Sequence, residues 1–137
     1  MQLLQTLGFR ASAEPIQSYG PLYEPENRYQ TAFTYWGADY PSASTFFRPL
    51  VTCDALFNTA ALCDAELDSL VDRATGKLDN DPVAAQMLWE EADRTVVELT
   101  PHLWLVNPLS VDFVSPRLEN YQRHPQWGSI LSQMWVK

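Results

Sequence analysis

The sequence contains few basic residues: nine lysines and arginines stand against seventeen aspartates and glutamates, for a formal net charge of −8 over 137 residues. No lysine or arginine cluster could neutralise phosphates, which argues against nucleic acid and against an anionic membrane surface as partners. No apolar run approaches about 20 residues, so no bilayer-spanning segment is expected. Residues 1–4 lack the basic region and the cleavage site of a signal peptide. These features leave a cytosolic protein, a mature secreted protein or a piece of a longer chain.

The sequence also lacks the residue patterns of known catalytic and metal sites. It has no G-x-S-x-G, no glycine-rich phosphate loop and no H-E-x-x-H. His102 and His124 each adjoin a proline, and neither lies within helical reach of a carboxylate or a cysteine. A glycosidase pair of Asp39 and Asp112 has no support beyond the acidity of the two residues. We therefore expect no enzyme activity, no metal and no cofactor.

Cysteine occurs only twice, at Cys53 and Cys63. Nine residues separate the two, which is the wrong spacing for a C-x-x-C redox or zinc motif. A disulfide between them would close a short loop, stabilise the fold by about 2–3 kcal/mol and imply an oxidising compartment. Two buried free thiols are the alternative, and the spacing leaves both open.

The residues that are abundant indicate one globular domain with many loops. The apolar fraction of 46% and the charged fraction of 19% are those of a folded protein, not of a disordered chain. A chain of this length buries about two-thirds of its unfolded surface. Ten prolines and five tryptophans favour long loops and amphipathic aromatic surfaces.

Hydrophobic periodicity predicts an α/β fold with a mixed sheet flanked by helices. Asp64 and Asp81 are expected to cap two helices, the second with Pro82 in its first turn. Residues 102–106 are nearly all apolar, as in strands covered on both faces. Helices are expected at 1–7, 41–47, 64–74 and 81–99, strands at 9–13, 28–36, 102–106, 111–114 and 130–137, and irregular structure at 14–27, 52–63 and 115–129.

One short stretch, Trp36-Gly37-Ala38-Asp39-Tyr40-Pro41, directly follows the expected strand 28–36. A carboxylate just beyond a strand end, in a turn broken by glycine and flanked by aromatic rings, lies where α/β proteins bind ligands. Such a carboxylate would favour an ammonium group. Alternatively, Asp39 could accept backbone N–H groups of the turn or of the next helix. The residues alone leave both interpretations open.

This stretch resembles the W-x-A-D-Y-x-x-P segment of the peptide and nickel class of extracellular solute-binding proteins, the ligand-capturing subunits of ABC importers. Other segments resemble the class in the same order along nearly the whole chain. No single motif is diagnostic, but the colinear order is specific. These segments lie at 5–9, 53–70, 81–94, 100–105, 113–117, 120–122 and 125–128, the last three being similar to the closing segment of an actinobacterial-type branch.

The resemblance implies the C-terminal lobe of a two-lobed, type II periplasmic-binding-protein-like fold. Residues 1–115 would form the ligand-binding lobe, and residues 116–137 a closing segment that returns toward the other lobe. The protein would be extracellular, periplasmic or lipid-anchored, and would deliver a short peptide to membrane permease subunits. Because members of the class are much longer, this chain would be a part of one and would bind ligand weakly or not at all by itself. It would expose apolar surface around Trp127 and Trp135, through which it could form a homodimer.

The resemblance also assigns the ligand site to one turn. Asp39 would receive the N-terminal ammonium of the peptide, and Trp36 would line the cleft. Gly37 and Ala38 would bring backbone groups close to an extended ligand, with Tyr40 at the flank.

Cys53 and Cys63 resemble the cysteine pair of many members of the class, which implies a disulfide. The chain departs from the D-Y-P-D-P pattern of many members, because Ser42 and Ala43 follow Pro41. This departure leaves a peptide, a sugar and a metal chelate open as ligands. The alternative function is a stand-alone sensory or protein-interaction domain with the same fold.

Overall fold

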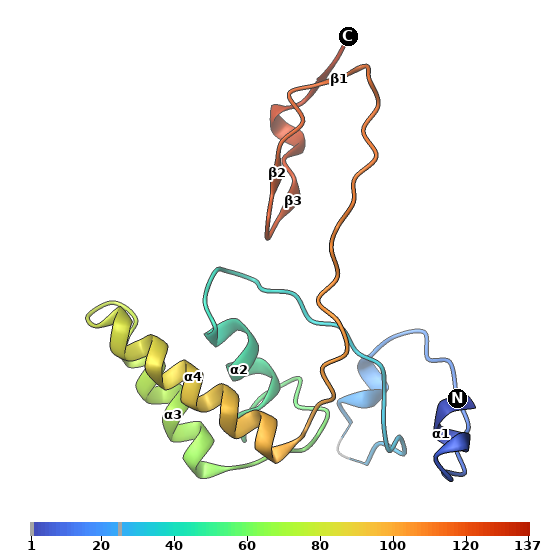
Figure 1. Ribbon diagram of the computed structural model, residues 1–137, viewed down its shortest axis with the longest axis vertical. Helices are drawn as coiled ribbons and strands as arrows, with labels where there is room; N and C mark the ends of the chain where they lie inside the picture. Colours follow the sequence, from blue (N-terminus) through green and yellow to red (C-terminus); the bar gives the residue numbers. More distant parts are fainter. Residues whose placement is uncertain (1, 25) are drawn as a thin grey trace. The chain divides into compact units, whose positions relative to one another are not determined.

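The computed structural model describes residues 2–24 and 26–137 and contains helices and two small antiparallel sheets (Figure 1). The chain divides into two compact units, the first ending at Thr34 and the second beginning at Tyr35. The helices are α1 (Gln2–Thr6), α2 (Ser44–Leu50), α3 (Ala65–Lys77) and α4 (Pro82–Leu99), with 3-10 helices η1 (Gly20–Leu22) and η2 (Leu131–Gln133). The strands are β1 (Leu118–Glu119), β2 (Arg123–His124), β3 (Gly128–Ser129) and β4 (Trp135–Val136).

The first unit contains α1, η1 and irregular segments. α1 ends before Gly8, as predicted, because Gly8 has φ +90°, a backbone conformation that favours glycine. The expected strand at 9–13 is not formed. Residues 14–24, 26 and 27 are irregular as expected, apart from η1. Met1 and Pro25, which belong to the predicted helix 1–7 and to this loop, lie outside the described residues.

Two helices of the second unit begin at the predicted caps. Asp64 accepts a hydrogen bond from the Leu67 amide at 2.8 Å, and Asp81 accepts one from the Ala84 amide at 3.1 Å. Each bond satisfies one of the amides that a helix start leaves without a partner. α3 continues to Lys77, a little beyond its predicted end, and α4 ends at Leu99 as predicted. α2 begins at Ser44, three residues later than expected.

The hydrophobic core lies among α2, α3 and α4, which pack side by side (Figure 1). In α4, Ala85, Trp89, Ala92 and Val96 are buried, whereas Leu88 is partly buried and Leu99 is exposed. Full burial of a side chain such as that of Val96 stabilises a fold by roughly 1.5–3 kcal/mol. The core consists of Leu50, Val51, Leu67, Leu70, Val71, Ala74, Trp89, Ala92 and Val96.

The mixed sheet expected from the sequence is not formed, and this corrects the predicted strands at 28–36, 102–106 and 111–114. In the described part of the chain, strands pair only as β1 with β4 and β2 with β3, both antiparallel. A strand exists only when a neighbour accepts and donates its backbone hydrogen bonds, and a β-rich composition does not supply that neighbour. Residues 102–106 were expected to form a strand covered on both faces, but the apolar side chains of this segment are open to solvent. Leu103, for example, is 83% exposed.

Short paired strands occur instead near the C-terminus. β2 and β3 form a hairpin within 115–129, where no regular element was expected, and Gly128, the first residue of β3, has φ +72°. The predicted strand 130–137 contains only η2 and β4. Trp127 and Trp135 are exposed, as predicted. None of the helices in residues 2–24 and 26–137 combines the length and the apolar character needed to cross a lipid bilayer.

Candidate functional site

The loop before α3 is closed by a disulfide between Cys53 and Cys63, which confirms the predicted pairing. The side chain of Asn58 closes the same loop from inside. Its Nδ2 donates to the carbonyl of Thr52 at 3.1 Å and to that of Leu62 at 2.6 Å, and its Oδ1 accepts from the Leu62 amide at 3.1 Å. The disulfide and the Asn58 amide therefore hold the ends of one loop together.

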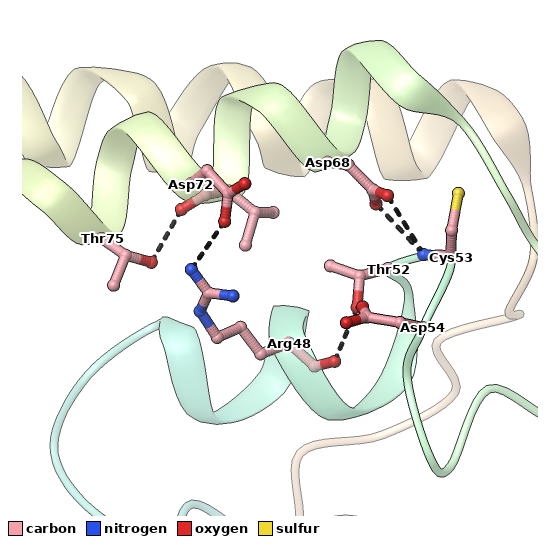
Figure 2. Close-up of polar contacts among 8 residues, drawn as sticks. Arg48, Thr52, Cys53, Asp54, Asp68, Asp72 and Thr75 are labelled. Carbon is pink, nitrogen blue, oxygen red and sulfur yellow. Dashed lines mark hydrogen bonds and ion pairs between the residues drawn. The ribbon is translucent and has the colours of Figure 1, made fainter.

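Polar contacts join this loop and α2 to α3. The Asp68 carboxylate of α3 accepts the backbone N–H of Cys53 at 3.1 Å, and Arg48 of α2 contacts Asp72 of α3 at 2.7 Å (Figure 2). Thr52 donates its hydroxyl proton to the Arg48 carbonyl at 2.9 Å, which ties the start of the loop to the end of α2. The loop is thus fixed on the helical core and can serve as a rigid support.

This support extends to the predicted ligand-binding turn through two aromatic rings. The ring of Phe57, in the middle of the disulfide loop, lies 4.9 Å from the ring of Trp36, centroid to centroid. Both side chains are half-buried and pack against the core. Trp36 also donates its indole N–H to the carbonyl of Thr45 at 2.9 Å. The indole is therefore held by an aromatic contact and by a hydrogen bond.

Asp39 forms hydrogen bonds with the same residue, Thr45. The Asp39 amide donates to the Thr45 hydroxyl at 2.9 Å, and that hydroxyl donates to Oδ2 of Asp39 at 3.3 Å. Thr45 is 2% exposed, whereas Asp39 is exposed. Asp39 therefore presents an accessible carboxylate from a fixed backbone.

The helix-cap interpretation of Asp39 is wrong. α2 has Ala43 at its N-cap position and no side-chain capping bond. Among the hydrogen bonds of the described residues, the Asp39 carboxylate accepts only that of the Thr45 hydroxyl, and its Oδ1 accepts none. None of the ion pairs in the described ranges includes Asp39.

The other predicted site residues surround Asp39 in the turn. Tyr40 hydrogen-bonds through its hydroxyl to the buried Ser44 hydroxyl at 3.0 Å. The carbonyl of Ala38 accepts the Nε2–H of Gln126 at 3.1 Å. Gly37 is exposed, and a Cβ there would lie 3.3 Å from the hydroxyl of Tyr35. Sequence reasoning missed both Thr45 and Gln126. Thr45 lies six residues after Asp39 but belongs to no recognisable pattern, and Gln126 lies 88 residues from Ala38.

The remaining acid of the discarded glycosidase pair, Asp112, has its own partners. It forms an ion pair with Nε of Arg123 at 2.9 Å and accepts the Tyr121 hydroxyl at 2.6 Å. It lines a cavity of about 340 Å³ together with apolar side chains such as Phe113 and Met134. Because Arg123 neutralises it, Asp112 is a weaker candidate for a cationic ligand than Asp39.

The two histidines differ in their contacts: His102 is half-buried, whereas His124 accepts hydrogen bonds from the backbone. Burial lowers the pKa of His102, whose Nδ1 is buried without a hydrogen-bond partner. His124 accepts the amides of Gln126 and Trp127 at Nδ1 and stacks on the Trp127 ring at 4.3 Å. Within the described ranges, no three His, Cys, Asp or Glu side chains gather as a metal ion requires.

Comparisons of the chain with protein-family models, with curated proteins and with solved structures find no match.

Proposed function

We propose that the chain captures short peptides for an ABC importer, as the C-terminal lobe of a type II extracellular solute-binding protein. Residues 1–115 would form the ligand-binding lobe and residues 116–137 the closing segment. The protein would work outside the cell membrane, in the periplasm or anchored to lipid, and would pass its ligand to permease subunits. The observation that carries the proposal is the exposed Asp39 carboxylate, which is tied to Thr45 and has no ion-pair partner in the described part of the chain.

The chemistry of the turn suits the ammonium end of a peptide. An ammonium group can donate to Oδ1 of Asp39 and form a charge-assisted hydrogen bond. The aromatic face of Trp36, three residues away, can contact the first side chain of the peptide or attract its positive charge. In this class of protein the second wall of the cleft comes from another lobe, so we expect this chain alone to bind weakly.

The test is a titration of the chain with tri-alanine. Binding is measured by calorimetry or, where it is weak, by NMR. Replacement of the carboxylate in Asp39→Asn keeps an acceptor for Thr45 but removes the charge, so we expect about three- to tenfold weaker binding. Asp93→Asn is the matched control, because Asp93 is an exposed acid on α4. Equal affinity of Asp39→Asn and the unmodified chain would contradict the ammonium role.

A stand-alone sensory or protein-interaction domain is the second candidate, and the exposed segment at 103–114 favours it. Leu103, Leu109 and Phe113 are each more than four-fifths exposed. Contiguous exposed apolar surface is typical of surfaces that bind other proteins. This candidate predicts that the unmodified chain does not bind tri-alanine, which the titration above measures.

A further inference from the structure

One buried residue, Thr45, contacts both side chains of the turn that are proposed to bind the ligand. Its carbonyl accepts the indole N–H of Trp36 at 2.9 Å. Its hydroxyl accepts the backbone N–H of Asp39 at 2.9 Å and donates to the Asp39 carboxylate at 3.3 Å. A threonine hydroxyl has one proton to donate and can accept as well, so this hydroxyl serves both groups of Asp39.

We propose that Thr45 is a positioning residue that sets the specificity of the site for a free ammonium group. The inference rests on the proposed function and adds a residue to it. By occupying Oδ2 of Asp39, the hydroxyl restricts the rotation of the carboxylate and leaves Oδ1 as the oxygen that receives the ligand. Preorganisation of this kind raises affinity because the carboxylate loses less rotational freedom on binding.

The surroundings of Thr45 keep its hydroxyl in place. Thr45 lies in the first turn of α2 and is 2% exposed, and its neighbour Ser44 is also buried. Ser44 hydrogen-bonds to Tyr40 and Ser42, so three further hydroxyl groups hold the turn between Asp39 and α2. Because Thr45 is β-branched and lies in a helix, its side chain has few rotamers available.

The experiment compares Thr45→Val with Thr45→Ser. Valine has nearly the shape of threonine but no hydroxyl, whereas serine keeps the hydroxyl. The probes are tri-alanine and N-acetyl-tri-alanine, in which the acetyl group converts the N-terminal ammonium into a neutral amide. In Thr45→Val we expect binding of tri-alanine to weaken about three- to tenfold and the preference for the free amine to shrink by the same factor. Thr45→Ser should bind within about twofold of the unmodified chain.

A spectroscopic readout separates positioning from general damage to the fold. Both variants keep the Thr45 carbonyl, so the indole N–H signal of Trp36 in NMR should stay near its original position. Thr75→Val is the matched control, because the hydroxyl of Thr75 in α3 also donates a hydrogen bond, to the Val71 carbonyl at 2.7 Å. Thr75→Val should leave the affinity and the amine preference unchanged. If Thr45→Val does not fold, Thr45→Ala replaces it with the same expectation.

Two results would overturn the inference. One is an unchanged preference for the free amine in Thr45→Val, and the other is a loss of tri-alanine affinity in Thr45→Ser as large as that in Thr45→Val. Failure of the proposed function has a different signature, since the unmodified chain would then bind both probes equally or neither of them. A reduced preference in Thr45→Val with the Trp36 signal in place supports the inference.

Discussion

The helical region of residues 44–99 and the extended segment at 102–114 are similarly rich in apolar residues but use them in opposite ways. In the helical region, Leu67, Val71, Ala74 and Ala92 are completely buried. In the extended segment, most of the large apolar side chains are exposed. The difference lies in hydrogen bonding, because a helix satisfies its backbone within its own residues and a strand requires a neighbour. Apolar content alone therefore does not decide where a core forms.

The largest expected effect on the free energy of unfolding comes from replacing a leucine in the helical region, and a leucine in the extended segment serves as the comparison. Leu67→Ala removes a side chain that is 0% exposed, and we expect the free energy of unfolding to fall by about 2–5 kcal/mol. Leu109→Ala removes a side chain that is 94% exposed, and the change should be within about 0.5 kcal/mol. Urea unfolding of both variants measures the difference. A similar loss in Leu109→Ala would show that the segment 102–114 is covered in solution.

The next effect concerns the disulfide that supports the helical region. Reduction of Cys53–Cys63 should lower the free energy of unfolding by about 2–3 kcal/mol, because the reduced loop gains freedom in the unfolded chain. The double variant Cys53→Ser/Cys63→Ser is the control, since a reductant cannot affect it. Mass spectrometry of unreduced exported protein should find the two cysteine-containing peptides linked. Free thiols in that material would contradict the extracellular proposal.

The smallest expected effect is on the pH dependence of stability. It comes from His102, which follows α4 at the junction of the two regions. Burial lowers the pKa of His102 in the folded chain below its ordinary value of about 6.5 in the unfolded chain. The unfolded state therefore binds the proton first, and the stabilising contribution is complete above pH 6.5 and lost as the pH falls below it. Urea midpoints between pH 7.5 and 5.5 should decline less in His102→Gln than in the unmodified chain. Parallel declines would show that His102 titrates normally.

The sequence predicted α3 and α4 well because their signals are local. Asp64 and Asp81 lie directly before the helices that they cap, and the buried apolar residues of each helix recur at helical spacing. The strand predictions at 28–36 and 102–106 failed for the opposite reason. A strand is completed by residues elsewhere in the chain or in another chain, and the composition of one segment does not name them.

The candidate site was predictable in part. The cysteine pairing was correct, whereas the ligand-binding role of the turn around Asp39 stays a prediction from its residues and its resemblance. The role of Thr45 depends on the backbone path that brings its hydroxyl to Asp39, and nothing in the sequence marks it. The contact of Gln126 with the Ala38 carbonyl joins residues 88 positions apart, which a single sequence cannot specify.

The most direct test of the central claim is an NMR titration that compares tri-alanine with N-acetyl-tri-alanine. The claim is that Asp39 receives an ammonium group beside Trp36. We expect tri-alanine to shift the amide signal of Asp39 and the indole signal of Trp36, and the acetylated peptide to shift them far less. Equal shifts with both peptides, or shifts confined to other residues such as those around Asp112, would contradict the claim.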